Sequence, residues 1–134
     1  MPRRRFKTEI LVRNNRVDIM EKQGIFVNYS VLSDDDYLRE LKKKILEEAN
    51  EVAEAEDDEE LKLEIADVLE VVENILAVKN ISLEEIQDLK IKKQNKIGKF
   101  DKKLKTYYVE MDDDNEALGY YLSRPNKYPE IDVK

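Results

Sequence analysis

Apolar residues recur at helical spacing in the part of the chain that follows residue 33. At about 100° per residue, six of them fall on one stripe, which predicts an amphipathic helix. They are Tyr37, Leu38, Leu41, Ile45, Ala49 and Val52. Ser33 is a candidate N-cap and three aspartates follow it, so we expect the helix to begin there. It should end at about Ala55.

A second helix is predicted from about residue 57 or 58 to residue 79, with a wide apolar arc. The arc comprises Leu61, Ile65, Val68, Leu69, Val71, Val72, Ile75, Leu76 and Val78. A helix this apolar is buried on more than one side. We therefore expect a homo-oligomer, most simply a two-fold dimer that completes a four-helix core, or a dimer of dimers.

A third helix is predicted to open with the capping box Ser82 to Glu85 and to end near Gly98. The expected fold class is all-α, a bundle of three to four main helices. Residues 1–32 are less regular. There we expect an ordered appendage, with an extended segment at 10–12, a short helix at 17–22 that ends before Gly24, and β-prone residues at 25–32.

The end of the chain is less regular too. Residues 104–109 could extend a fourth helix or form a strand, and residues 110–134 are expected to form an irregular tail that docks by Tyr120, Tyr121 and Tyr128. The predicted organisation is thus one domain, 1–109, with a helical core at 33–105, followed by the tail.

The amino-acid composition limits the kinds of catalytic and metal-binding site that the chain can form. Of the 134 residues 41% are charged, and only three are glycine and three proline, as in a helical protein with well-solvated faces. Cysteine and histidine are absent, which excludes disulfides, Ser-His and Cys-His nucleophile pairs and nearly all zinc sites. A bound metal would have oxygen ligands, which points to Mg²⁺, with Mn²⁺ as an alternative. No apolar run approaches the roughly 18 residues of a membrane span, so we expect a soluble cytoplasmic protein without membrane contact.

Charge is distributed unevenly. The net charge of -7 argues against nucleic acid as a partner. Residues 33–88 carry 20 acidic and 6 basic side chains, whereas residues 90–105 carry eight lysines against the single Asp101. An acidic metal-binding face beside a basic segment would suit a polyphosphate bound through magnesium.

Four carboxylates, Glu48, Glu51, Glu64 and Asp67, lie on the apolar sides of the first two predicted helices. Glu48 falls in the middle of the first stripe and Glu64 within the second arc, while Glu51 and Asp67 flank them one turn away. Antiparallel packing would bring the two pairs together as oxygen ligands for one or more Mg²⁺ ions. Alternatively, the helices are rotated from this phase or water reaches the bundle at this level.

Three lysines are candidate phosphate ligands. Lys93 lies within the apolar stripe of the third helix, and Lys96 lies beside it. Lys44 precedes Glu48 by one turn on the same side. They could reach phosphate oxygens next to the metal site, but a lysine in such a stripe also commonly extends its ammonium group to water.

These residues resemble a known family. Glu47-Glu48-Ala-Asn-Glu51 followed by Glu64-Ile-Ala-Asp67 is similar to the EExxE…ExxD signature of the MazG-like all-α nucleoside triphosphate pyrophosphohydrolases. The small house-cleaning branch, related to phosphoribosyl-ATP pyrophosphohydrolase, also has counterparts of Leu11-Val-Arg-Asn-Asn15, of the 34–44 segment and of Gly98-Lys-Phe100. The likeness covers about residues 8–105. Asn14 and Asn15 replace an Asp-Lys pair, and Ile97 replaces a frequent basic residue.

The resemblance implies hydrolysis of a nucleoside triphosphate to the monophosphate and pyrophosphate, with non-standard nucleotides as possible substrates. Glu48, Glu51, Glu64 and Asp67 would ligate Mg²⁺, and a carboxylate such as Glu47 or Glu51 would help to deprotonate water. Lysines of the third helix would stabilise the leaving pyrophosphate.

Two other interpretations stay open. One is a non-catalytic helical dimer whose acidic face binds a basic protein partner, which explains the charge but not carboxylates inside apolar stripes. The other is a degenerate family member that binds a nucleotide without cleaving it, which the differences at Asn14, Asn15 and Ile97 would allow.

Overall fold

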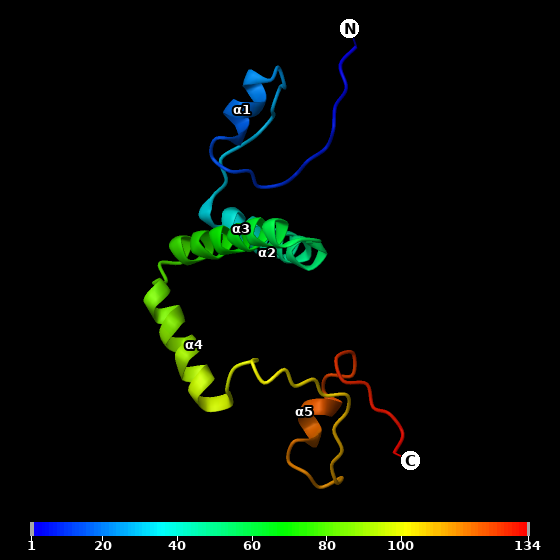
Figure 1. Cartoon of the computed structure of the whole chain (residues 1–134). Helices are drawn as coiled ribbons and strands as arrows, with labels where there is room; N and C mark the ends of the chain where they lie inside the picture. Colours follow the sequence, from blue (N-terminus) through cyan, green and yellow to red (C-terminus); the bar gives the residue numbers. More distant parts are fainter. Residues whose placement is uncertain (1, 134) are drawn as a thin grey trace. The chain divides into compact units, whose positions relative to one another are not determined.

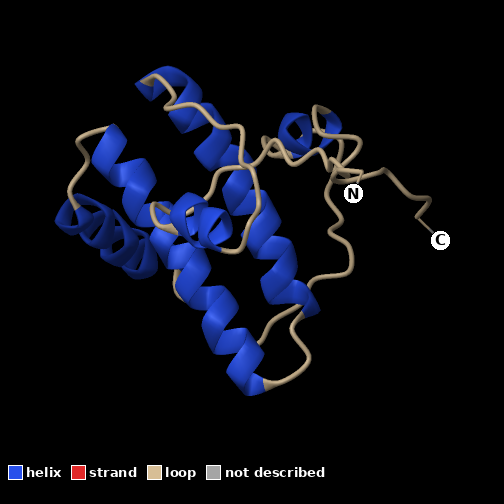
Figure 2. Cartoon of the chain, turned by 90° about the horizontal axis from the view of Figure 1, so that it is seen from above, coloured by secondary structure: helices blue, strands red, loops and turns tan. Residues whose placement is uncertain are grey.

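The computed structural model describes residues 2–133, and over that range the secondary structure is entirely helical (Figures 1 and 2). The expected all-α class is therefore confirmed. In chain order the helices are α1 (Arg16–Lys22), α2 (Asp34–Glu54), α3 (Asp58–Val78), α4 (Leu83–Ile97) and α5 (Leu118–Leu122). None of the helices within 2–133 is both long and apolar enough to cross a membrane.

The chain divides into two compact units, Met1–Lys96 and Ile97–Lys134. The first contains α1, α2, α3 and all but the last residue of α4. The second contains α5 and the irregular segments around it. The candidate site lies entirely within the first unit.

Helices α2 and α3 form an antiparallel hairpin, and their ends match the capping signals of the sequence. The backbone N–H of Asp36 donates to Ser33 Oγ at 3.3 Å, which caps α2. The N–H of Glu60 donates to Asp57 Oδ1 at 2.8 Å, which caps α3. Only residues 55–57 separate the two helices, so the chain reverses at once and α3 packs along α2 (Figures 1 and 2).

The centre of the hairpin is small. Within residues 2–133 the side chains that are almost fully enclosed are Leu41 and Glu48 on α2 and Val71 on α3. Leu41 and Val71 supply apolar contact, and Glu48 is a charged residue at the same depth. The outer part of the wide α3 arc has no such cover, since Ile65 and Leu69 are 44% and 56% exposed.

Helix α4 begins with the capping box that the sequence predicts. The N–H of Glu85 donates to Ser82 Oγ at 3.1 Å, and the N–H of Ser82 donates to Glu85 Oε2 at 3.2 Å. These bonds satisfy two of the backbone donors that have no partner within the helix at this end. Gly98 follows the last residue of α4 with a φ of 85°, a left-handed conformation that glycine adopts without strain.

The parts outside these helices agree less well with the sequence-based expectations. The short helix α1 is present, but 10–12, 25–32 and 104–109 are neither helix nor strand. For 104–109 both proposed conformations are wrong. Lys103 adopts a φ of 61° and its N–H donates to Phe100 O at 3.0 Å, so a turn separates α4 from this segment. No neighbouring strand pairs with it in the described range.

The second unit contains a short helix, α5, that the sequence pattern did not predict. The rings of Tyr120 and Tyr121 on α5 and of Tyr128 pack on one another, with centroids 5.1 to 6.0 Å apart. The Arg124 guanidinium lies 4.0 Å from the centre of the Tyr120 ring. These aromatic side chains thus form a local cluster within the tail.

Candidate metal centre

The four carboxylates that stand out in the sequence converge in the structure. Glu48 and Glu51 come from α2, and Glu64 and Asp67 from α3. Each offers one oxygen, and these four oxygens all lie within 4.8 Å of one another. The spacing of three residues places each pair on successive turns of one helix face, and the antiparallel hairpin sets the two faces against each other.

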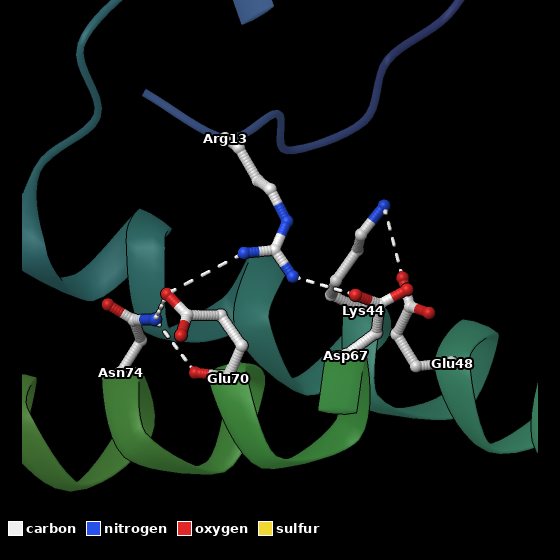
Figure 3. Close-up of polar contacts among 6 residues, drawn as sticks. All are labelled: Arg13, Lys44, Glu48, Asp67, Glu70 and Asn74. Carbon is white, nitrogen blue, oxygen red and sulfur yellow. Dashed lines mark hydrogen bonds and ion pairs between the residues drawn. The ribbon is translucent and has the colours of Figure 1, made fainter. Parts of the chain in front are cut away.

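Burial makes this cluster unusual. The Glu48 side chain is 8% exposed, and its Oε2 atom has no hydrogen-bond partner. Glu64 Oε2 is likewise buried without a partner. The cation nearest to Glu48 is Lys44, whose Nζ lies 3.7 Å from the other carboxylate oxygen, Oε1 (Figure 3). An ionised oxygen at such depth is costly unless a proton or a cation neutralises it.

The pKa values of two carboxyls in the cluster show the same cost of burying negative charge. A hydrogen bond between the Glu64 and Glu51 carboxyls, followed by burial and by the negative charges of Glu51, Asp67 and Glu48, raises the pKa of Glu64 to about 7. Burial, followed by the hydrogen bond and the charge of Glu51, also raises the pKa of Glu48, although Lys44 opposes the shift. Near neutral pH the cluster therefore binds a proton readily, which is the behaviour expected of a site whose natural counter-charge is a cation.

The donor set fits a hard divalent cation. All four side chains offer oxygen, and neither imidazole nor thiolate is present anywhere in the sequence. Oxygens on opposite sides of one Mg²⁺ ion lie about 4.2 Å apart, and those around the larger Ca²⁺ about 5 Å apart. A spread of at most 4.8 Å thus requires only small side-chain movements to enclose one ion.

Arg13 is a further residue at the site, and sequence reasoning gave it no role. Its Nη2 atom donates to Asp67 Oδ1 at 2.7 Å, and its Nη1 atom lies 4.0 Å from Glu70 Oε1 (Figure 3). The N-terminal segment thereby contacts α3 across 54 residues of sequence. The only available signal was its place in the Leu11-Val-Arg segment, because a contact of this range leaves no periodic pattern.

Lys44 and Glu47 lie beside the cluster. Lys44 Nζ is 3.3 Å from Glu47 Oε2 as well as 3.7 Å from Glu48 Oε1, so it bridges two adjacent carboxylates of α2. The Glu47 side chain is 43% exposed and is not among the four converging residues. Lys44 is thus close enough to the candidate metal site to contact a ligand there.

Lys93 and Lys96 lie on α4, and both are exposed. Among residues 2–133 no hydrogen bond or ion pair joins either ammonium group to the four carboxylates. Their role in binding phosphate stays a prediction. The structure therefore groups Lys44 with the carboxylates and leaves the two α4 lysines apart from them.

A cleft opens onto the carboxylates. It has a volume of about 880 Å³, which is in the range of sites for small organic ligands. One side is formed by residues 10–16 and Ile19, and the other by residues of α2 and α3, including Glu48 and Asp67. On the hairpin side Tyr37 donates its hydroxyl to Asn74 Oδ1 at 3.2 Å, and Asn74 donates to Glu70 O at 2.8 Å. These bonds fix polar groups in a wall that also contains Leu41 and Val71.

Comparison with known proteins adds no relative: no family model, no curated protein and no solved structure matches this chain. The resemblance to the MazG-like family therefore stays a prediction based on the residues that carry it. What can be assigned to the site rests on its own geometry.

Proposed function

We propose that this protein is a magnesium-dependent nucleoside triphosphate pyrophosphohydrolase, which converts a nucleoside triphosphate and water into the monophosphate and pyrophosphate. The observation that carries the proposal is the unpartnered Oε2 of Glu48, nine-tenths buried inside a cluster of four convergent carboxylates. The cleft beside them supports it, because a nucleotide needs both a cation for its phosphates and a pocket for its nucleoside. The choice of reaction rests on the resemblance of the carboxylate pattern to the signature of the MazG-like family.

Glu48, Glu51, Glu64 and Asp67 would hold Mg²⁺, for which Mn²⁺ can substitute. When bound, the ion would neutralise and orient the triphosphate and lower the pKa of the attacking water. The general base that accepts a proton from the attacking water would be one of two carboxylates. Glu51 lies within the cluster, and Glu47 lies outside it in contact with Lys44. The position of Glu51 favours it, because its carboxylate lies among the four convergent residues that would surround the ion.

The lysines would stabilise the negative charge of the phosphates. Lys44 has its ammonium group beside Glu48 and can turn from Glu47 to a phosphate oxygen without leaving the site. Lys93 and Lys96 would act on the leaving pyrophosphate, as the family resemblance implies.

A homo-oligomer is part of the proposal. The α3 residues Ile65 and Leu69 are about half exposed. A second copy, packed two-fold against it, would cover these side chains and complete a four-helix core.

One observation favours a second candidate, a nucleotide-binding protein without turnover. Arg13 already neutralises Asp67, so the cluster has a counter-charge of its own. Asn14 and Asn15, where the family has a charged pair, line the cleft.

Release of pyrophosphate from a panel of canonical and modified nucleoside triphosphates, with Mg²⁺, tests the proposal. The wild type should hydrolyse at least one of them, and Glu64→Ala should lower the rate by about a hundredfold or more. Glu73→Ala is the matched control, because Glu73 is an exposed carboxylate of the same helix outside the cluster.

The possible outcomes separate the alternatives. Nucleotide binding without pyrophosphate release would favour the second candidate. If no nucleotide is hydrolysed and Mg²⁺ leaves the thermal stability unchanged, the metal-dependent reaction is excluded.

A further inference from the structure

Arg13 is positioned to compete with a cation for the negative charge of Asp67. Its Nη2 atom donates to Asp67 Oδ1 at 2.7 Å, and Asp67 is one of the four convergent carboxylates. A guanidinium group stays protonated at any pH the protein experiences, so it cannot yield by losing its charge. A divalent cation bound by Asp67 would repel the guanidinium, so it favours release of this oxygen by Arg13.

The surroundings indicate where Arg13 would go. Its Nη1 atom lies 4.0 Å from Glu70 Oε1, and Glu70 is outside the four-carboxylate cluster (Figure 3). Contact with Glu70 would keep the guanidinium at the edge of the cleft while the nitrogen atom facing Asp67 becomes free. The Arg13 side chain is 64% exposed, so no packing restrains this movement.

The released Arg13 guanidinium would line the cleft in which a phosphate group is expected. The same cleft is lined by Arg13, Arg16 and Lys44 and reaches Glu48 and Asp67, so a phosphate near the cation would lie within reach of these positive charges. A guanidinium binds phosphate through two parallel hydrogen bonds, which a lysine cannot imitate.

We propose that Arg13 is a phosphate-binding residue of the cleft, paired with Asp67 in the metal-free protein and transferred to the polyphosphate of a nucleotide when Asp67 becomes a metal ligand. This inference rests on the proposed function and deepens it. Arg13 competes with the cation for Asp67 and then assists the nucleotide, so it makes the two ligands cooperative: each binds more tightly when the other is present.

Two binding titrations test this inference without reference to turnover. The first measures Mn²⁺ binding to the nucleotide-free protein by electron paramagnetic resonance. The second measures binding of an α,β-methylene nucleoside triphosphate, which resists cleavage between these phosphates, by calorimetry at saturating Mn²⁺. Analogues carrying the four common nucleobases are compared first, and the one that the wild type binds most tightly is used. Each titration uses wild type, Arg13→Gln, Arg13→Lys and, as the matched control, Arg39→Gln, because Arg39 is a similarly exposed arginine that pairs with Asp36 outside the cleft.

The two affinities of Arg13→Gln should change in opposite directions. Mn²⁺ should bind about three- to fivefold more tightly, because an exposed ion pair no longer competes for Asp67. The nucleotide analogue should bind about tenfold more weakly, because a charge-assisted contact is lost. Arg13→Lys should recover part of the analogue affinity, and Arg39→Gln should change either constant by less than about twofold.

A purely structural role for Arg13 predicts a different result, because loosening the site would lower the affinity for Mn²⁺ and for the nucleotide analogue together. Equal weakening of both, or no change in either, would overturn the inference while wild-type hydrolysis leaves the proposed function intact. If the wild type binds no Mn²⁺ at all, the proposed function fails and this inference with it.

Discussion

Glu51 and Glu64 face each other from α2 and α3 with carboxylate oxygens no more than 4.8 Å apart, and their interaction is the leading cause of the raised pKa of Glu64. Two carboxyl groups can hydrogen-bond to each other only if one of them is protonated. A proton shared by this pair would relieve the repulsion at the point where the two helices present their charges. Deprotonation of this pair opens the site to a cation and destabilises the hairpin.

The stability of the metal-free protein should accordingly depend on pH through Glu64. Its pKa rises from 4.5 to about 7 on folding. Between these two values the folded state keeps the proton that the unfolded state has lost, so the group lowers the free energy of unfolding as pH rises through this range. The raised pKa of Glu48 contributes in the same direction.

Thermal unfolding in a chelator from pH 5 to pH 8 measures this effect. The wild type should lose stability relative to Glu64→Gln as pH increases, whereas Glu73→Gln should run parallel to the wild type. A wild type that gains stability relative to Glu64→Gln over this range would contradict the shared proton.

Mg²⁺ should reverse the loss of stability at pH 7.5. A ligand present at a hundred times its dissociation constant raises the free energy of unfolding by about 2.7 kcal/mol, and the ion should therefore raise the melting temperature. Glu48→Gln removes a buried charge from the cluster and should abolish most of the increase. Glu54→Gln, an exposed position at the end of the same helix, should keep it.

Replacing Glu48 by leucine should make the metal-free protein more stable. Glu48 lies at the depth of Leu41 in the centre of the hairpin, and one of its oxygens is unpartnered. Removing an unsatisfied buried carboxylate in favour of apolar contact should raise the free energy of unfolding by about 1–2 kcal/mol.

The same Glu48→Leu protein should release no pyrophosphate and show no stabilisation by Mg²⁺. Chemical denaturation in a chelator measures the free energy of unfolding, and the pyrophosphate assay measures the catalytic activity. A marked loss of stability would mean that Glu48 is satisfied in some way other than by a cation.

Assembly through α3 predicts the effect of a charge at Leu69. This side chain is 56% exposed in the single chain. Light scattering should give the mass of a dimer or of a multiple of it for the wild type, and Leu69→Glu should shift the distribution towards the monomer. Leu46→Glu is the control, because Leu46 is an exposed leucine on α2, with 67% of its surface accessible. A monomeric wild type would exclude this assembly.

The part of the site that the sequence predicted is the part that helical periodicity determines. Glu48 falls in the middle of an apolar stripe, and the structure buries it. The caps at Ser33 and Ser82 marked where α2 and α4 begin to within a residue. These features depend on spacing within one helix, which a single sequence displays directly.

Features that depend on contacts between distant segments were not predictable in this way. Arg13 lies in a segment without regular structure and contacts Asp67 54 residues later. Helix α5 packs against Tyr128, which lies outside the helix, through its own Tyr121. Because this contact is not local, helix propensity alone gave little indication of α5. The β-prone composition of 104–109 was misleading because a strand also needs a partner.

The burial of Glu48 has a consequence for the history of the chain. A lineage that no longer needed the cation would gain stability from almost any mutation that brought an apolar side chain to this position, and drift would soon replace the glutamate. An intact Glu48 in a descendant would then mark continued selection for cation binding. Leucine or methionine at the same place would mark its loss, well before the rest of the helical hairpin changed.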